Sequence, residues 1–398
     1  MSGILISDRV YRAPKRYRDG THRAAVPAAT LARARPLMKP LGITRLANLT
    51  GLDCLGIPVF AAIRPNGRSL STSQGKGLSV DAAAASALME SIETWHAEHI
   101  QLPRVRGSIR ALRERRPLAD VRRLPREPGR KLDLDARLEW VEGWDLMNGA
   151  AVWVPLESVT LDCVFRRGYQ PTFALGSNGL ASGNHLLEAI VHGLCEVIER
   201  DAEAQWRLQR GQRRVDLDTV TDAHCRALLD RIAAGRVRTT VWDITSDVGV
   251  PAYGCAIMED PREPAWRALG LYQGFGCHLD APVALARALS EAVQTRVSYI
   301  SGSRDDFFPH DYDRTTDEPL LRQIWDELDQ PPAESVDFKG APRLAAATFE
   351  ADLRLLLDRL RTGGSRQVLV VNLSRPELGI PVVKLLVPGR ATRLDLMG

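Results

Sequence analysis

Three segments of the chain repeat one short acidic pattern, Leu-x-Glu-x-Ile/Val-Glu/Gln, in residues 88–93, 194–199 and 289–294. On an α-helix, residues three or four apart share a face, so each copy pairs an apolar stripe with two neighbouring acidic or amide side chains. Two glutamates at that spacing repel each other by roughly a few tenths of a kcal/mol in an isolated helix. Mg2+ offsets such repulsion because it binds carboxylate and phosphate oxygens. The repeat therefore predicts a magnesium and phosphate site, with three solvated helix faces as the alternative.

Two glycine-containing segments precede the first two copies. Residues 73–77 read Ser-Gln-Gly-Lys-Gly, and residues 176–184 read Gly-Ser-Asn-Gly-Leu-Ala-Ser-Gly-Asn. We expect loops whose backbone can approach an anion near the start of a helix, with Lys76 supplying positive charge. The first segment lacks the spacing of a Walker A motif. Flexible turns that bind nothing are the alternative for both segments.

Other catalytic patterns are missing from the sequence. It has no G-x-S-x-G elbow, no H-E-x-x-H pair and no G-x-G-x-x-G after a strand. The six cysteines include no C-x-x-C pair, so a zinc site is poorly supported and we expect reduced, mostly buried thiols. We interpret His96, His99, His185 and His192 as structural or surface residues rather than catalytic bases.

Composition indicates a globular protein outside the membrane. Hydrophobic residues make up 44% of the 398 and charged residues 26%. No apolar run is long enough to span a membrane and no secretory signal is evident, so we expect a cytoplasmic protein. The formal net charge of +4 argues against a nucleic-acid partner. Basic residues nevertheless cluster in residues 9–39 and 104–131, either as a solvated face or as a docking surface for an acidic partner.

Strand and helix patterns alternate along the chain. Residues 1–40 look like an irregular basic arm, and residues 41–398 like a single domain of mixed α/β (α+β) class. We expect strands within 43–63, 138–164, 239–257, 267–278, 367–371 and 382–387, and a loop-rich excursion at 103–131. Helices are expected at 80–100, 185–209, 283–301 and 349–362, with Ser79 or Asp81 capping the first. The first three carry the acidic repeat, so they should converge on one pocket.

Three longer motifs extend the repeat. They are S-x-G-K-G-x(8)-S-A-x-x-E-x-x-E in residues 73–93, S-N-G-L-A-S-G-N-x-x-x-E-A-I-x-H-x-L-C-E-x-I-E-R-D in 177–201, and A-L-x-E-A-x-Q-x-R-x-x-x-I-S-G-S-R-D-D in 288–306. These motifs closely resemble the YcaO family, and the likeness spans roughly residues 15–390. Members of that family bind ATP and Mg2+ and phosphorylate a peptide-bond oxygen so that a nucleophile can replace it. Such a reaction needs positioning and charge neutralisation more than a nucleophilic side chain.

The resemblance implies a role for each matching residue. The carboxylates that it implies face the metals and phosphates are Glu90, Glu93, Glu196, Glu199 and Glu291. The last four of these are the candidate catalytic residues. Residues that contact phosphate or order those carboxylates are Lys76, Arg200, Gln294 and Arg296. Ser79, Asn178 and Asn184 match positions near the nucleotide, and so do Thr21 and Arg23 of the N-terminal arm.

The resemblance leaves the product open. An azoline forms when the nucleophile is a Cys, Ser or Thr side chain of the substrate. A thioamide forms when the nucleophile is sulfide. Azoline-forming members often end in a proline-rich P-x-P-x-P tail, whereas this chain ends in VKLLVPGRATRLDLMG, which looks like the thioamide-forming branch. That branch implies a peptide or protein substrate, a TfuA-type partner protein and a sulfur donor. A non-catalytic scaffold that binds a peptide or partner is the second alternative, and the choice between monomer and homodimer stays open.

Overall fold

The computed structural model describes residues 3–165, 168–209 and 213–390. Its strands form four sheets. The six-stranded sheet runs β6 (Arg104–Gly107), β7 (Leu138–Asp145), β15 (Leu369–Asn372), β16 (Val382–Leu386) and β9 (Leu180–Ser182), with β8 (Ala150–Pro155) also paired to β7. The five-stranded sheet runs β13 (Tyr272–Cys277), β12 (Ala252–Glu259), β11 (Val237–Asp243), β10 (Arg213–Asp216) and β14 (Glu334–Asp337). The smaller sheets are β3 (Arg45–Asn48), β4 (Val59–Ile63) and β5 (Thr72–Lys76), and the hairpin of β1 (Ile4–Ile6) and β2 (Arg9–Tyr11).

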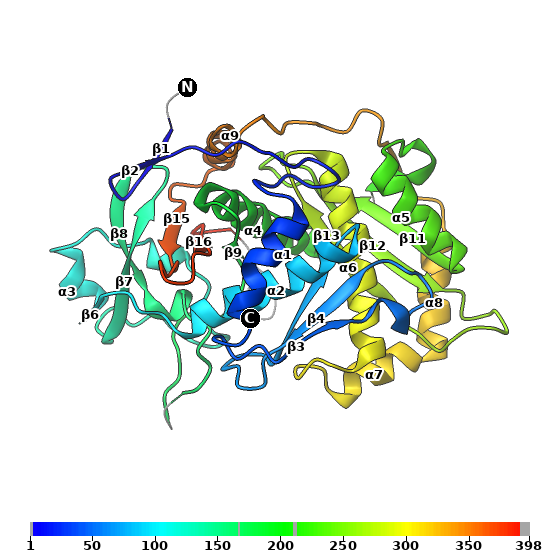
Figure 1. Cartoon of the computed structure of the whole chain (residues 1–398), viewed down its shortest axis with the longest axis horizontal. Helices are drawn as coiled ribbons and strands as arrows, with labels where there is room; N and C mark the ends of the chain where they lie inside the picture. Colours follow the sequence, from blue (N-terminus) through cyan, green and yellow to red (C-terminus); the bar gives the residue numbers. More distant parts are fainter. Residues whose placement is uncertain (1–2, 166–167, 210–212, 391–398) are drawn as a thin grey trace.

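Three long helices lie in the middle of the molecule (Figure 1). They are α2 (Val80–Glu98), α4 (Leu186–Gln209) and α6 (Ala281–Ser301), and each carries one copy of the acidic repeat. The other helices are α1 (Pro27–Ala34), α3 (Ile109–Arg113), α5 (Ala223–Ala234), α7 (Pro309–Thr316), α8 (Glu318–Asp329) and α9 (Phe349–Thr362). Helix α2 packs on β4 and β5, α4 on β9, β16 and β13, and α6 on β12 and β13. The three sheets and their helices thus meet at one place, and the mixed α/β class predicted from the sequence is confirmed.

Glycine allows two of these helices to lie unusually close to their strands. A Cβ on Gly75 of β5 would stand 2.0 Å from the backbone nitrogen of Ala87 in α2. A Cβ on Gly274 of β13 would stand 2.1 Å from the backbone nitrogen of Ala292 in α6. Real Cβ atoms do not approach backbone atoms so closely, so only glycine fits at either position. The alanines on the facing helix surfaces serve the same close packing.

Several local expectations need correction. Residues 73–77 were expected to form a loop, but 72–76 form strand β5, because Gly75 serves helix packing rather than chain reversal. The arm in residues 1–40 is not irregular, since it contains the β1–β2 hairpin and α1. The excursion at 103–131 contains β6, α3 and the 3-10 turn η3 (Val121–Arg123). None of the helices in the described part of the chain is long and apolar enough to cross a membrane.

Candidate functional site

The edges of the sheets hold the carboxylates of helix α2. Strand β9 ends the six-stranded sheet, and Ser182 at its end donates both its backbone N–H and its hydroxyl to Oε1 of Glu93, at 2.7 and 2.6 Å. Strand β5 ends the three-stranded sheet, and the backbone of Gln74 hydrogen-bonds to Glu90. Edge strands expose unpaired N–H groups, and here these groups bind glutamates of the neighbouring helix.

Strand β13 does the same for the other two helices. It ends the five-stranded sheet and lies between α4 and α6. The N–H of Cys277 donates to Oε2 of Glu199 on α4 at 2.8 Å, and the N–H of Phe275 donates to Oε1 of Glu291 on α6 at 3.4 Å. Alternate residues of a strand point their N–H groups to the same side. One strand edge therefore holds carboxylates from two helices.

The glutamates interact with one another through their charge. Burial raises the pKa of Glu90 and of Glu196 to about 7, and that of Glu93 to about 8. Repulsion between neighbouring carboxylates adds to each shift. Burial also raises the pKa of Glu199, which is only 1% exposed. The structure thus brings the predicted acidic residues into one electrostatically coupled group, called the acidic site below.

Two predicted cations lie in the acidic site. Nζ of Lys76 stands 2.6 Å from Oε2 of Glu291, and the guanidinium of Arg200 stands 3.5 Å from Glu291 and 3.3 Å from Glu199. Burial alone would raise the pKa of Glu291, but Lys76 and Arg200 outweigh it and lower that pKa to about 2. Glu291 is therefore ionised. The acidic side chains of the site outnumber these two cations, so Glu90, Glu93 and Glu196 are not neutralised by them.

Two further cations were not singled out from the sequence. The guanidinium of Arg287 on α6 lies 3.8 Å from Oε2 of Glu199. Lys384 on β16 is 3% exposed, and its Nζ donates to the carbonyl of Gly176. Burial lowers the pKa of Lys384 to about 8, and the nearby charge of Glu196 partly opposes the shift. A lysine within the apolar run Val-Val-Lys-Leu-Leu was the signal that could have identified it.

The donor set suits a hard divalent cation. Oε1 of Glu199 is buried and has no hydrogen-bond partner among the described residues. Carboxylate oxygens are the protein ligands that Mg2+ prefers. Among residues 3–165, 168–209 and 213–390, no three His, Cys, Asp or Glu side chains form a ready-made metal cluster. Metal binding by the five glutamates therefore stays a prediction, which the charge and chemistry of the acidic site favour.

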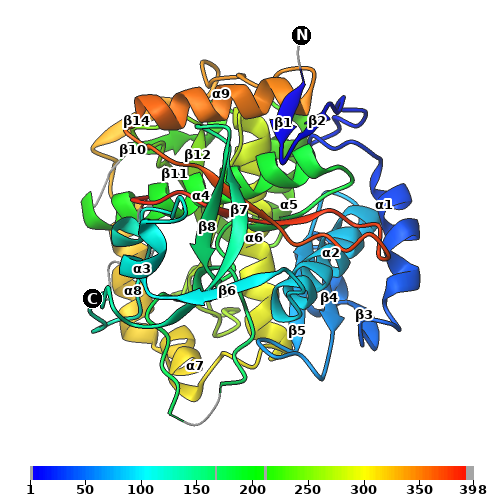
Figure 2. The same ribbon diagram turned by 90° about the vertical axis from the view of Figure 1, so that its left-hand side faces the viewer.

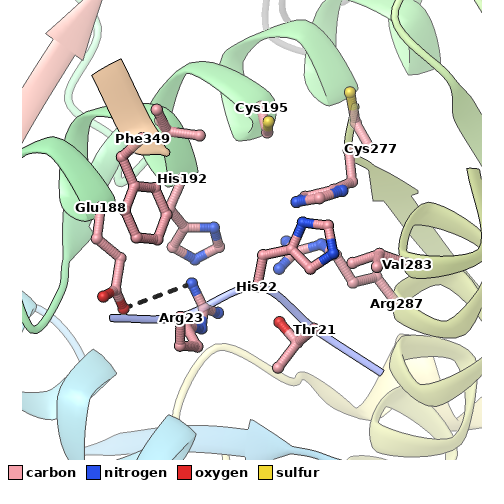
Figure 3. Close-up of a pocket in the computed structure, with 12 residues that line it drawn as sticks. Thr21, His22, Arg23, Glu188, His192, Cys195, Cys277, Val283, Arg287 and Phe349 are labelled. Atoms are coloured by element: carbon pink, nitrogen blue, oxygen red, sulfur yellow. Dashed lines mark ion pairs between the residues drawn. The ribbon is translucent and has the colours of Figure 1, made fainter. Parts of the chain in front are cut away.

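A recess lies beside the acidic site (Figure 3). Thr21 and Arg23 of the N-terminal arm line it, and Arg23 lies 3.9 Å from Glu188 on α4. The nucleotide contacts of Thr21 and Arg23 stay predictions. Figure 3 shows the rings of His22 and His192 facing the same space. Burial lowers the pKa of His22 to about 4, so its ring is neutral at pH 7. Cys277 also lines the recess, which therefore adjoins the carboxylate of Glu199.

The remaining predicted residues have varied surroundings. Asn184 accepts hydrogen bonds from Thr30 and Arg33 of the arm, at 2.9 and 3.0 Å, and donates to Glu188. This network fixes the arm to the start of α4 and explains why Glu188, which was not among the predicted site residues, belongs to the recess. Ser79 caps α2 by accepting from the N–H of Ala82, which confirms the predicted cap.

Asn178 and Gln294 are both half-buried. Oδ1 of Asn178 has no hydrogen-bond partner within the described residues. Gln294 follows Glu291 by three residues on α6 and so shares its side of the helix. The nucleotide contacts of Ser79, Asn178, Asn184 and Gln294 stay predictions.

Arg296 departs from its predicted place. Its guanidinium is fully buried and pairs with Asp53 at 3.0 Å and with Glu259 at 2.6 Å, neither of which belongs to the acidic site. In this structure it ties α6 to β12 and to the turn after β3, and does not order the five glutamates. The cause is helix geometry, because residues 291 and 296 are five apart and lie on different sides of α6.

Comparison with known proteins adds independent information. The model of the family described as YcaO cyclodehydratase, ATP- and Mg2+-binding, matches residues 74–391. An uncharacterized protein in the tfuA 3′ region of Rhizobium leguminosarum bv. trifolii is 38% identical over 394 residues, which is 96% of this chain and 90% of the relative.

Two solved structures have a similar fold. YcaO from Methanopyrus kandleri bound with AMPPCP and Mg2+ has a TM-score of 0.75 at 24% identity, over 95% of each chain. A heterocyclase in complex with substrate and cofactor has a TM-score of 0.80 at 24% identity, over 98% of this chain and 55% of that one. This chain therefore spans about half the length of that heterocyclase.

Proposed function

Because this chain belongs to the YcaO family of ATP- and Mg2+-binding, peptide-modifying enzymes, we propose that it converts a backbone amide of a peptide into a thioamide. The amide oxygen attacks the γ-phosphorus of ATP, and ADP leaves. Hydrosulfide then adds to the amide carbon, and phosphate departs with the former amide oxygen, leaving a carbon–sulfur double bond. Phosphorylation is needed because an amide oxygen by itself is a poor leaving group.

The observation that carries this proposal is the excess of buried carboxylates in the acidic site. Glu90, Glu93 and Glu196 have pKa values of about 7 to 8 without a bound cation. Carboxylates that burial alone keeps protonated become ionised when a divalent cation binds. We assign Glu90, Glu93, Glu196, Glu199 and Glu291 as the residues that hold Mg2+. When bound, the metal neutralises charge on the triphosphate during phosphoryl transfer.

The chain's own residues position the reactants. The N–H groups of Ser182 and Cys277 each occupy one oxygen of a glutamate, which orients the other oxygen. Lys76 and Arg200 contact carboxylates, and we propose that they contact phosphate oxygens as well. Thr21, Arg23 and the neutral His22 line the recess that adjoins Glu199, and we propose that this part of the arm contacts the nucleotide. We further propose that Asn178 and Gln294 contact the nucleotide phosphates.

Cyclodehydration is the second candidate. The family description and the heterocyclase of similar fold favour it. The relative found in a tfuA 3′ region favours thioamide formation with a TfuA-type partner that delivers sulfur. The run Val-Val-Lys-Leu-Leu-Val-Pro-Gly in residues 382–389 also favours the thioamide.

Mass spectrometry of the modified peptide separates the two reactions. The enzyme is co-expressed with the genes that flank its own, and the peptides are compared with those from a Glu196→Gln strain. Replacement of a backbone oxygen by sulfur adds about 16 Da, whereas cyclodehydration at Cys, Ser or Thr removes about 18 Da, since in both reactions the phosphorylated oxygen leaves. A loss of water would contradict the thioamide proposal. No change with either strain would contradict peptide modification altogether.

A further inference from the structure

A second charged feature lies outside the acidic site, in residues 104–131. Eleven arginines and lysines and three acidic residues fall in this stretch, a net charge of +8 against +4 for the whole chain. All eleven basic side chains are exposed. The stretch comprises β6, α3, η3 and the loops between them, and is called the basic lobe below. It lies at one end of the molecule, and Figure 2 shows α3 and β6 in front on that side.

The basic lobe is a folded surface. Ile109, Leu112, Val121 and Leu124 are all less than 9% exposed and pack into the core beneath β7 and β8. Ser108 caps α3 by accepting from the N–H of Ala111. Apolar residues thus point inward while the basic ones point outward. The guanidiniums are held on a stable scaffold, which lowers the entropy lost when they bind a partner.

Most of these cations have no counter-charge of their own. Arg104 pairs with Glu139 and Arg110 with Asp135. The other nine have no ion pair with any described residue. Some exposed arginines elsewhere are paired, as with Arg213, which lies 3.1 Å from both Asp243 and Glu334. A concentration of unpaired like charge destabilises the folded chain and attracts an oppositely charged partner.

The basic lobe is joined to the loop that enters the acidic site. The N–H of Glu127 donates to the carbonyl of Thr172, and the N–H of Ala174 donates to the carbonyl of Pro125. Two residues after Ala174, the carbonyl of Gly176 accepts from Lys384. The same segment continues to Ser182, which binds Glu93. A molecule held on the basic lobe therefore lies next to the chain segment that borders the carboxylates.

We propose that the basic lobe docks an acidic segment of the peptide substrate and so leads the rest of that peptide to the acidic site. Clustered arginines recognise carboxylates through paired N–H groups, and an extended acidic peptide can contact several of them at once. The inference rests on the proposed function, since it takes the peptide to be the substrate. It adds where the peptide is gripped and what chemistry the gripping segment has.

A charge-reversal experiment tests the docking. The probe is a fluorescein-labelled peptide of about 15 residues with roughly eight glutamates among glycine and serine, a length and charge suited to contacting several guanidiniums. The lobe variant is Arg113→Glu, Arg115→Glu, Arg122→Glu. The matched control is Arg35→Glu, Lys39→Glu, Arg45→Glu, three exposed cations outside the lobe with the same total change in charge.

We expect the probe to bind the wild-type protein in a salt-dependent manner. Binding should weaken at least about tenfold in the lobe variant and by less than about twofold in the control, because each lost charge pair contributes only a modest part. Equal losses in the two variants would overturn the proposal, because net charge alone would then explain binding. A single-stranded oligonucleotide of equal charge serves as a second probe. The proposal would also be overturned if this oligonucleotide bound more tightly than the peptide and its binding weakened equally in the lobe variant.

Three further measurements keep the result independent of other failures. A probe with a benzophenone at one end should cross-link to residues 168–184, and cross-links confined to other segments would overturn the link to the acidic site. A neutral variant with the same three arginines changed to glutamine guards against misfolding. It should show a smaller loss of probe binding than the lobe variant. Magnesium-dependent ATP hydrolysis without peptide should match wild type in the lobe variant. Absence of that hydrolysis in the wild type would count against the proposed function, whereas the probe's binding would still decide the docking.

Discussion

Glu199, which we propose as a metal-binding residue, is buried in a way that is unfavourable for stability. It is 1% exposed, and its Oε2 accepts from Cys277. Its Oε1 lies 3.3 Å from Arg200 but has no hydrogen-bond partner among the described residues. Burying an incompletely paired carboxylate costs stability. Such a residue is expected where a cation must bind.

We predict that Glu199→Gln lowers turnover at least about a hundredfold, because it removes one full charge from the proposed metal and phosphate site. The melting temperature of the ligand-free variant should equal or exceed that of wild type, since the unfavourable charge is gone. Turnover and thermal unfolding check the two parts. The exposed Glu327→Gln serves as control and should change neither. Wild-type turnover in the folded Glu199 variant would contradict the assignment.

The raised pKa values give the metal-free protein a definite pH dependence. The folded pKa of Glu93 is about 8 and that of Glu196 about 7, both above the ordinary 4.5. The folded state therefore holds protons that the unfolded state releases. The stability that these protons provide is full below about pH 4.5 and is lost as pH rises through 7 to 8.

We predict that the metal-free protein melts at a lower temperature at pH 8.5 than at pH 6. Mg2+ with a non-hydrolysable ATP analogue should raise the melting temperature more at pH 8.5, because protons then compete less with the metal. Thermal scans in EDTA and in Mg2+ at both pH values test this. A larger stabilisation by Mg2+ at pH 6 would show the sign to be wrong.

Arg296 has a structural role in this fold. Its guanidinium is buried against Asp53 and Glu259, whose side chains are 4% and 6% exposed. We predict that Arg296→Met lowers the free energy of unfolding by about 3–5 kcal/mol, because it leaves buried carboxylates unpaired. Urea unfolding measures the loss. The exposed pair of Arg110 with Asp135 is the control, and Arg110→Met should leave the free energy of unfolding nearly unchanged. Unchanged stability with weaker nucleotide binding would instead restore the phosphate role predicted from the sequence.

Among the secondary-structure elements, the edge strands matter most for the acidic site. Strands β5, β9 and β13 each end a sheet, and each donates backbone N–H groups to glutamates of a neighbouring helix. Edge strands usually need protection from unwanted pairing. Here the carboxylates occupy these donors, so the same contacts that orient the acidic side chains also satisfy the edges.

The close approach of strand and helix depends on glycine. We predict that Gly75→Ala destabilises the protein by about 1–3 kcal/mol or more, because its Cβ would overlap the backbone of α2 and push the helix from β5. Turnover should fall as well, since Glu90 moves with α2. Denaturant unfolding and turnover give the two readouts. Gly340→Ala is the control, because a Cβ there meets nothing within 4 Å. Equal stability of the two variants would refute the close-packing argument.

At the scale of the whole molecule, the chain devotes its centre to the acidic site and its recess. The described residues contain no further domain that could carry sulfur. We predict that the purified protein converts its peptide only slowly with free sulfide, and that adding the TfuA-type partner raises the rate at least about tenfold, because a carrier raises the local concentration of sulfur at the acidic site. Rates with and without the partner test this. Full activity with sulfide alone would contradict it.

The sequence alone determined the long helices and their acidic residues. The boundaries of α9 were predicted as observed, and those of α4 within one residue, because both helices have a strong apolar periodicity and clear ends. The strands around Trp140 and Val152 were also predicted. Glu90, Glu93, Glu196, Glu199 and Glu291 could be named because both their spacing and the motifs around them are local properties of the chain.

Tertiary structure decided which of these residues meet and what holds them. Lys76 was predicted to face phosphate from a loop, yet it lies at the end of a strand and pairs with Glu291, 215 residues away. Lys384 joins the acidic site from a strand that looks purely apolar apart from this residue, while Arg296 leaves it for Asp53 and Glu259. Sequence spacing reports which residues share a face of one helix. Which sheet edge that face meets depends on contacts between distant segments, and those arise only when the whole chain packs.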